Sequence, residues 1–495
     1  MMEFYNIAQL ENRKRADLLV IPYWKGKKRP EPACQLGNLE KVVAGPLEAN
    51  DFLGKEGEIV ILYPSEQSEA RFALLGLGDP ETITVEKLRR AYASLIKGCR
   101  ERKVKEINLI FPRIKPLDLE ACARGIAEGI LLPNYVYTQL KHDSLKDGLP
   151  VLIEKATFVG AGAAEVRVAK KYRDIAEGVY LARDLINGNA DDVFPSHLGI
   201  VAKELAHQFP QIKTTIFDKK WIEKQGMGLL LAVNQGSNKE PAFIISHYKG
   251  DPSSKQNTVL VGKGITYDTG GLNLKPTGFM ETMKSDMSGA ATVLGTLHAV
   301  AKLKLPINLI GVIPAAENAI SANSFKPGDV YRSYTGKTVE IGNTDAEGRL
   351  ILADALAYAV EHLKPTRIID FATLTGAVEI ALGNEVIGLL SNQDALADAL
   401  LSSGFSTYER LCRLPLYEEY REALKSEIAD IRNIGGRPAG TITAAMFLQE
   451  FVGDTPWAHC DIAGTAYSLE GRRYIPKLAS GIGVRLMADF LEKLI

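Results

Sequence analysis

The feature that most constrains the fold is a regular alternation of short apolar runs with stretches of helical periodicity. In the second half of the chain, apolar runs at residues 258–265, 307–314 and 367–374 alternate with helical stretches at residues 288–303 and 348–363. Runs of this kind are typical of strands buried on both faces, and helices between them connect parallel strands. The pattern predicts an α/β fold with a mostly parallel central sheet, which binds ligands beyond the carboxyl ends of its strands.

The same alternation in the first half of the chain indicates a second domain. A charge-rich helical stretch at residues 166–186 follows it and ends in a cluster of turn residues at 187–195. A chain of 495 residues is also too long for one ordinary hydrophobic core. We therefore expect two domains, each a helix-flanked sheet. The expected parts are an N-terminal α/β domain at residues 1–165, a connecting helix at 166–190 and a C-terminal domain at 191–495.

Composition narrows the classes of partner. The formal net charge is −1, which argues against an overall field that attracts nucleic acid or a membrane surface. No apolar run is long enough to span a membrane, and the first residues lack the apolar core of a signal peptide. Five cysteines without paired spacing fit the reducing cytoplasm. The basic run at residues 25–30 is more typical of a solvated loop than of a nucleic-acid patch.

Charged side chains gather at the ends of predicted strands and the starts of predicted helices. Four of them lie in a glycine-rich stretch at residues 259–295 that begins as a buried strand, and three alternate along residues 345–349 at the start of a helix. In the predicted sheet these loops emerge at one edge. The seven residues are Lys263, Asp268, Lys275, Asp286, Asp345, Glu347 and Arg349.

Four carboxylates that converge in this way repel one another unless a positive charge lies among them. Oxygen ligands in this number suit two divalent metal ions that share carboxylates. The chain has seven histidines and neither an HxH nor an HExxH pattern, so a histidine-rich zinc site is not supported.

Each of these residues also has an ordinary structural interpretation. Asp286 could cap a helix, and Asp345 and Glu347 could interact with the dipole of theirs. Lys263 could extend from a strand end toward water, and Arg349 could pair with a helix carboxylate. Any one of these interpretations is reasonable, but all of them together, beside so many glycines, are much less so.

Several segments resemble the leucyl aminopeptidase (cytosol aminopeptidase) family, peptidase family M17. The segment NTDAEGRL at residues 343–350 matches the signature of that family and is highly specific. The resemblance extends from about Ala182 to the end of the chain, and the N-terminal part is similar to the family only in size and α/β pattern. Tyr267 and Thr269 stand where Phe and Ser are usual, but no charged position is changed. Five further segments carry the resemblance: residues 261–276, 283–293, 370–377, 433–448 and 457–466.

The resemblance implies a site for two divalent metal ions per subunit, Mn²⁺ or Zn²⁺. It implies that one ion is held by Asp268, Glu347 and Asp345, the last also through its backbone carbonyl. It implies that the other is held by Lys263, Asp268, Asp286 and Glu347, so that Asp268 and Glu347 bridge the two. The metal-binding part of the chain is then the C-terminal domain.

The resemblance further implies that Lys275 and Arg349 form the catalytic pair. Lys275 is expected to stabilise the developing oxyanion, and Arg349 to position a bicarbonate that transfers a proton. The residues expected to contact the substrate are Met283, Thr373, Leu374 and Gly376.

The expected function is that of a metal-dependent aminopeptidase, which releases N-terminal amino acids, preferably leucine-like ones, from peptides through a water activated by two metals. The family also implies a cytoplasmic homohexamer without a membrane partner. Two alternatives remain. A two-metal phosphoesterase uses similar carboxylates, although it normally adds histidines or an arginine cluster. An additional DNA-binding or regulatory role, as in some members of the family, is the other.

Overall fold

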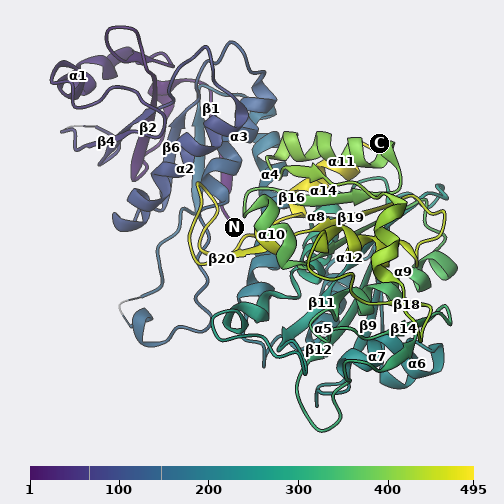
Figure 1. Ribbon diagram of the computed structural model, residues 1–495. Coiled ribbons are helices and arrows are strands. Elements are labelled where there is room, and N and C mark those ends of the chain that lie inside the picture. The colour runs from purple at the N-terminus through teal and green to yellow at the C-terminus, as the bar shows by residue number, and fades with distance from the viewer. Residues whose placement is uncertain (66, 147) are drawn as a thin grey trace. The chain divides into compact units, whose positions relative to one another are not determined.

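The chain divides into two compact units in a computed structural model that describes residues 1–65, 67–146 and 148–495. One unit comprises Met1–Ala176 with Glu470–Pro476, and the other comprises Glu177–Leu469 with Lys477–Ile495 (Figure 1). The division falls within the long helix α4 (Ala163–Asn187). Both units are α/β, which confirms the predicted fold class, whereas the predicted domain bounds stay a prediction.

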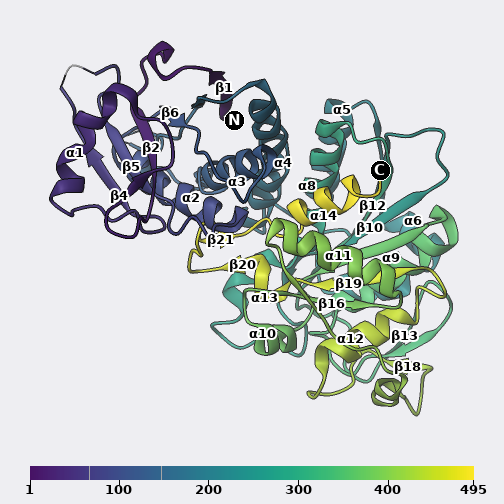
Figure 2. The ribbon, with the colours of Figure 1, turned by 90° about the horizontal axis from the view of Figure 1, so that it is seen from above.

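The first unit is built on a seven-stranded sheet with the order β1-β7-β6-β2-β5-β4, in which β3 pairs with β2. The pairs from β1 to β5 along this order are parallel, and β4 and β3 are antiparallel to their neighbours. Helices flank this sheet (Figure 2). The strands are β1 (Glu3–Ile7), β2 (Leu18–Trp24), β3 (Glu31–Pro32), β4 (Ile59–Leu62), β5 (Phe72–Gly76), β6 (Glu106–Ile110) and β7 (Lys155–Val159), and the helices are α1 (Glu40–Glu48), α2 (Val85–Glu101) and α3 (Leu119–Leu131).

The second unit is built on a nine-stranded sheet with the order β17-β16-β19-β15-β10-β12-β9-β8, in which β11 pairs with β12. The central strands β19, β15, β10 and β12 are mutually parallel. Antiparallel pairs are β12 with β9, β9 with β8, and β19 with β16. A mostly parallel central sheet is therefore confirmed. The strands are β8 (Ile212–Phe217), β9 (Ala242–Lys249), β10 (Asn257–Gly262), β11 (Gly264–Asp268), β12 (Asn308–Asn318), β15 (Arg367–Ala372), β16 (Ile387–Ser391), β17 (Leu411–Arg413) and β19 (Trp457–Asp461).

Helices cover both faces of this sheet because its strands alternate in side-chain direction. Ile310 and Val312 of β12 belong to the core cluster formed with α9 (Gly348–Leu363), whereas Gly311 between them lies against Val293 of α8 (Ser288–Leu303). The helices α8 and α9 therefore pack on opposite faces. The remaining helices are α5 (Pro195–Gln208), α6 (Lys219–Gln225), α7 (Gly228–Asn234), α10 (Gly376–Leu382), α11 (Asp394–Thr407), α12 (Gly440–Gln449), α13 (Ala463–Ala466) and α14 (Val484–Glu492).

Short elements complete the second unit. The 3-10 helix η4 (Met280–Ser285) precedes α8, and two small sheets lie outside the main one. Their strands are β13 (Val330–Arg332), β14 (Thr338–Glu340) and β18 (Ile431–Arg432) in one sheet, and β20 (Tyr467–Ser468) and β21 (Leu478–Ala479) in the other. Among the residues that the structure describes, no helix is both long and apolar enough to cross a membrane.

Polar residues occupy the carboxyl ends of neighbouring strands in the second unit. Lys263 follows β10, Asp268 ends β11, Asn318 ends β12 and Asp461 ends β19. These strands are neighbours in the sheet, apart from β15 between β10 and β19, and Thr373 follows β15. Parallel strands bring all these ends to one edge, so the fold itself assembles the site predicted there.

Candidate active site

Lys263 lies at the centre of the charged cluster. Its side chain is 3% exposed, and its Nζ is 2.7 Å from Asp286 Oδ2 and 2.9 Å from Glu347 Oε1. The same Nζ donates a hydrogen bond of 2.8 Å to the carbonyl oxygen of Thr373. Because Lys263 directly follows β10, whose last five residues are buried, its amine is held among these oxygens and away from bulk water.

Gly348 gives the Lys263 side chain room to reach the acids. A Cβ atom added to Gly348 would lie 2.4 Å from Lys263 Cε and 2.7 Å from its Nζ, far inside ordinary contact. Gly348 is the first residue of α9, directly after Glu347. The glycine of the NTDAEGRL segment is therefore explained by the close approach of a lysine from a neighbouring strand.

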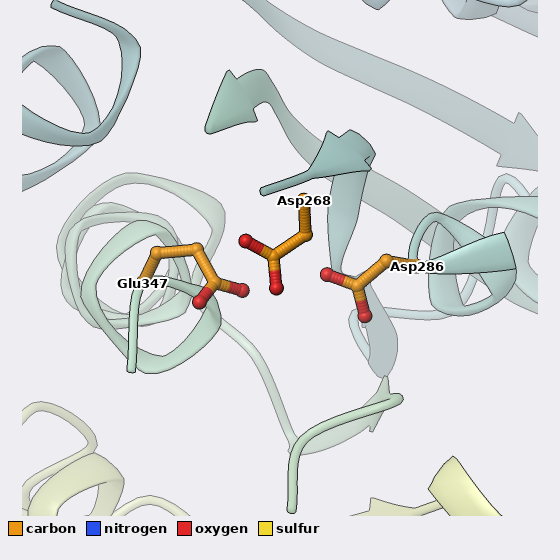
Figure 3. Close-up of side chains that lie close together, drawn as sticks. All are labelled: Asp268, Asp286 and Glu347. Carbon is orange, nitrogen blue, oxygen red and sulfur yellow. The ribbon is translucent and has the colours of Figure 1, made fainter. Parts of the chain in front are cut away.

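Three carboxylates form a compact group beside Lys263. Asp268, Asp286 and Glu347 each offer an oxygen, and these oxygens all lie within 4.8 Å of one another. Figure 3 shows the three side chains directed toward a common centre from separate elements. All three residues are buried, with exposures of 2%, 5% and 1% respectively. The structure thus brings together three of the five predicted metal ligands, with Lys263 in contact with two of them.

Asp345 lies at the edge of this group and is connected to it through Lys275. Lys275 Nζ is 2.6 Å from Asp345 Oδ1 and 2.9 Å from Asp268 Oδ2. The Asp345 side chain is 34% exposed, whereas that of Asp268 is 3% exposed. Asp345 therefore occupies the more open side of the cluster, and Lys275 spans the two acids.

Arg349 is buried behind the acids in the first turn of α9. Its Nη1 donates a hydrogen bond of 2.7 Å to the carbonyl oxygen of Asn433, and its Nε has no hydrogen-bond partner among the described residues. Burial lowers the pKa of the Arg349 guanidinium to about 10, although Glu347 and Asp461 act in the opposite direction. The side chain still carries its charge at neutral pH, and its Nε is a buried donor without a partner among the described residues.

The pKa values of the four acids are shifted by burial and by the neighbouring charges, which include two lysines. Burial, together with the charge of Glu347, raises the pKa of Asp268 to about 7 despite the two lysines. Burial also raises the pKa of Asp286 and of Asp345. The pKa of Glu347 is lowered, since Lys263 and Lys275 outweigh its burial. Two ammonium groups do not fully compensate four carboxylates, three of which are buried, so the cluster favours additional positive charge.

Burial acts on the pKa of the two lysines in the opposite sense, but the carboxylates outweigh it. Burial lowers the pKa of Lys263, but Asp286, Glu347 and Asp268 outweigh it and the net shift is upward. The pKa of Lys275 is likewise raised, because the surrounding carboxylates outweigh its burial. Without a metal ion, both amines are therefore held as ammonium groups.

The predicted substrate residues lie on η4 and on the segment between β15 and the start of α10. Thr373 Oγ1 donates a hydrogen bond of 2.6 Å to Asp286 Oδ1. Leu374 is half-buried against the core, and Gly376 is exposed at the start of α10, with no atom within 4 Å of an added Cβ. Met283 is half-buried in η4, and its carbonyl oxygen accepts the N–H of Asp286 at 3.3 Å. Thr373 and Met283 thus contact Asp286 directly, and the substrate-binding role of all four residues stays a prediction.

Three polar residues in contact with these segments were not singled out from the sequence. Asp461 accepts the backbone N–H of Leu374 at 3.1 Å and the hydroxyl of Thr375 at 2.7 Å. Asn433 accepts the N–H of Gly342 at 2.8 Å and supplies the carbonyl that binds Arg349. Asn318 donates to Asp268 at 2.8 Å. The signal that could have found two of them is a polar residue at the end of a buried strand, as in β12 and β19.

The residues present fit a divalent cation. Glu347 Oε2 is buried and has no hydrogen-bond partner among the described residues. Buried polar oxygens without a partner are rare and costly, and a metal ion is one of the few groups that satisfies several of them at once. Carboxylate oxygens from three elements, within 4.8 Å of one another, provide the donor set that such an ion requires.

The sequence matches two family profiles. The profile described as the cytosol aminopeptidase family, catalytic domain, matches residues 180–488. The profile of the N-terminal domain of the same family matches residues 20–144. The N-terminal part thus also belongs to the family, although its sequence had shown only a likeness in size and pattern.

Relatives and solved structures agree with these profiles. A probable cytosol aminopeptidase of Protochlamydia amoebophila is 53% identical over 100% of this chain and 99% of its own length. One from Chlamydia trachomatis is 46% identical over the same shares. The bottromycin maturation enzyme BotP in complex with Mn has a TM-score of 0.86 at 32% identity and covers 97% of this chain and 99% of its own. A mutant tomato leucine aminopeptidase has a TM-score of 0.87 at 30% identity and covers 100% and 97%.

These likenesses confirm the resemblance that the NTDAEGRL segment indicated. They extend over the whole chain and include both domains. The chain belongs to the cytosol aminopeptidase family, and it is a peptidase of the hydrolase class with aminopeptidase activity.

Proposed function

We propose that the enzyme holds two divalent metal ions in the cluster at the carboxyl edge of the second sheet and uses them to remove N-terminal, preferably leucine-like, residues from peptides. The observation that carries this proposal is the group of three buried carboxylates within 4.8 Å of one another. The solved structure of BotP with Mn supports divalent metal in a related protein. We propose Mn²⁺ or Zn²⁺ as the ions.

The proposed ligands divide between two sites. Asp268, Asp345 and Glu347 would hold one ion, with the backbone carbonyl of Asp345 as a further ligand. Lys263, Asp268, Asp286 and Glu347 would hold the other. Bound ions supply a water of lowered pKa and polarise the scissile carbonyl. Lys263 must lose its proton to act as a ligand, because an ammonium group has no lone pair to donate.

We propose that Lys275 stabilises the negative charge that develops on the substrate. Its side chain is 15% exposed, between Asp268 and Asp345, so its Nζ is fixed by two acids while one side remains accessible. The pKa of Lys275 is raised by these carboxylates after burial has opposed them, so the amine stays protonated at neutral pH. A fixed ammonium group can donate to a developing oxyanion without reorganising during the reaction.

We propose that Arg349 holds an anion beside the cluster. Its Nη1 already donates to Asn433, and its Nε is a buried donor without a partner among the described residues. We propose that this donor binds a bicarbonate that accepts and returns a proton, since the nearby carboxylates are assigned to metal. The guanidinium would then act on the proton transfer and leave metal binding unaffected.

Residues Met283, Thr373, Leu374 and Gly376 complete the proposal as the binding surface for the N-terminal residue of the substrate. Gly376 leaves open space at the start of α10, and Leu374 provides apolar surface beside it. An apolar residue of the size of leucine suits such a surface. Because the chain belongs to a peptidase family, the phosphoesterase alternative is set aside. The homohexamer and the cytoplasmic location stay predictions.

The test is metal binding and hydrolysis in Glu347→Gln. The metal-stripped protein is titrated with Mn²⁺ or Zn²⁺, and hydrolysis of leucine p-nitroanilide and bound metal are measured together. Glu347→Gln should bind less metal and lose activity, because a bridging carboxylate loses its charge in both sites.

Glu409→Gln is a matched control, because Glu409 is also buried but accepts hydrogen bonds from the backbone at the start of α14. It should lower stability and leave metal content unchanged. Full metal occupancy with wild-type turnover in Glu347→Gln would contradict the metal assignment.

A further inference from the structure

Asn318 connects the two segments that carry the acids. It is the last residue of β12 and is fully buried. Its Nδ2 donates a hydrogen bond of 2.8 Å to Asp268 Oδ1 and one of 3.1 Å to the carbonyl oxygen of Thr344. Asp268 ends β11, and Thr344 directly precedes Asp345. The amide of Asn318 therefore contacts both the end of β11, which carries Asp268, and the segment that carries Asp345 and Glu347.

The amide restricts how the Asp268 carboxylate can rotate. Asp268 Oδ1 accepts two hydrogen bonds, one from Asn318 and one of 2.9 Å from the backbone N–H of Gly270. Asp268 Oδ2 lies 2.9 Å from Lys275 Nζ. With Oδ1 held by two N–H groups, the rotation about the terminal bond of Asp268 is fixed. Oδ2 then faces Lys275.

The second segment is tied to the first around the same residue. Thr344 Oγ1 donates a hydrogen bond of 2.7 Å to the carbonyl oxygen of Gly270, and Thr344 N donates one of 2.9 Å to Asn273 Oδ1. The backbone carbonyl of Asn318 accepts the N–H of Thr269 at 2.9 Å and its hydroxyl at 2.8 Å. The loop that follows Asp268 and the loop that carries Asp345 and Glu347 are thus joined, and the Asn318 amide supports the junction.

We propose that Asn318 is a positioning residue for metal binding. Its amide orients the Asp268 carboxylate and fixes the distance between Asp268 and the segment that carries Asp345 and Glu347. Groups that orient a metal ligand by a hydrogen bond typically affect affinity strongly when they are removed. This inference rests on the proposed metal site, and it assigns a role to a residue that binds no metal itself.

The experiment measures Mn²⁺ binding to the full-length protein, from the electron paramagnetic resonance signal of free Mn²⁺, together with kcat and KM. Asn318→Ala should weaken Mn²⁺ binding by about 10- to 100-fold. The activity of Asn318→Ala should recover at saturating Mn²⁺ if the loss lies in metal positioning. Asn318→Asp keeps the volume of the side chain, so it provides a folded variant even if the alanine variant is unstable. It should also bind Mn²⁺ more weakly, because an acceptor then faces Asp268.

The matched control is Asn134→Ala. Asn134 is another buried asparagine, and it exchanges hydrogen bonds of 2.9 Å and 3.1 Å with the backbone of Ile153 in the first unit. Its loss should lower the melting temperature and leave Mn²⁺ affinity unchanged. A purely structural role for Asn318 would give the same pattern as Asn134→Ala and would overturn the inference.

Asp268→Asn separates this inference from the proposed function. If Asp268→Asn binds Mn²⁺ as the wild type does, the proposed metal site is wrong and the inference falls with it. If Asp268→Asn loses Mn²⁺ while Asn318→Ala and Asn318→Asp bind it with wild-type affinity, the metal site stands and the role of Asn318 is refuted. Weakened binding in Asp268→Asn and in the folded Asn318 variants, with Asn134→Ala unaffected, supports the role.

Discussion

Gly348→Ala tests whether the close approach of Lys263 to the start of α9 is needed for activity. The added methyl carbon would lie 2.4 Å from Lys263 Cε, about 1 Å short of an ordinary contact of 3.4 Å. Lys263 cannot easily move aside, because its Nζ is held by Asp286, Glu347 and the Thr373 carbonyl. The substitution should therefore displace either the amine or the helix start by about 1 Å.

The expected magnitudes follow from that displacement. A misplacement of about 1 Å in a catalytic group can cost about 100-fold in rate, which corresponds to about 2.7 kcal/mol of transition-state stabilisation. Stability should change less. Overpacking costs about 1–3 kcal/mol, and replacing glycine by alanine in a helix returns about 0.5–1 kcal/mol. The variant should thus remain folded while kcat/KM falls.

The assay is steady-state hydrolysis of leucine p-nitroanilide, with bound metal and urea unfolding measured on the same preparations. Gly98→Ala in α2 is the control, because the nearest atom to its added Cβ is Arg102 Nη1 at 3.5 Å. That variant should be as stable as the wild type or slightly more stable, with full activity. Wild-type kcat/KM and metal content in Gly348→Ala would refute the reasoning. Lys263 would then either tolerate the displacement or have no role in activity and metal binding.

Three further substitutions address individual charged groups. Lys263→Arg should lose one metal ion per chain as Lys263→Ala does, because a guanidinium stays protonated and cannot be a ligand; wild-type metal content by elemental analysis would leave Lys263 as a structural lysine. Arg349→Ala should lower kcat by about 10²–10⁴-fold with metal content near wild type, and added bicarbonate should restore part of the loss; if the metals are lost or the protein unfolds, the role is structural. Burial lowers the pKa of His459, but the Asp370 carboxylate at 2.6 Å outweighs it and raises the pKa. Stability from this pair is fully present below the ordinary histidine pKa of about 6.5 and is lost as pH rises through the raised value. Urea unfolding across that pH range should show a smaller loss of stability with rising pH in His459→Gln than in the wild type. The same dependence of stability on pH in both proteins would contradict this.

Much of the site could be predicted because its charged residues lie in short segments with a recognisable spacing. Asp345, Glu347 and Arg349 alternate at the start of a helix, and this alternation is visible without any tertiary information. Asn433 could not be found in the same way. It lies in a glycine-rich segment after β18, and only the fold brings its carbonyl to 2.7 Å from Arg349 Nη1.

The sequence by itself determined the kinds of elements, the parallel character of the central sheet and the family, because helix and strand periodicity and the NTDAEGRL segment are properties of consecutive residues. Only the tertiary structure decided which strand ends are neighbours. Asp286 and Glu347 meet at Lys263 because β10 lies between β12 and β15, with α8 and α9 on opposite faces. Strand order depends on how all the elements pack together, and the sequence of an apolar strand does not indicate which strand pairs with it. The positions of Asn318, Asn433 and Asp461 were therefore left to the fold.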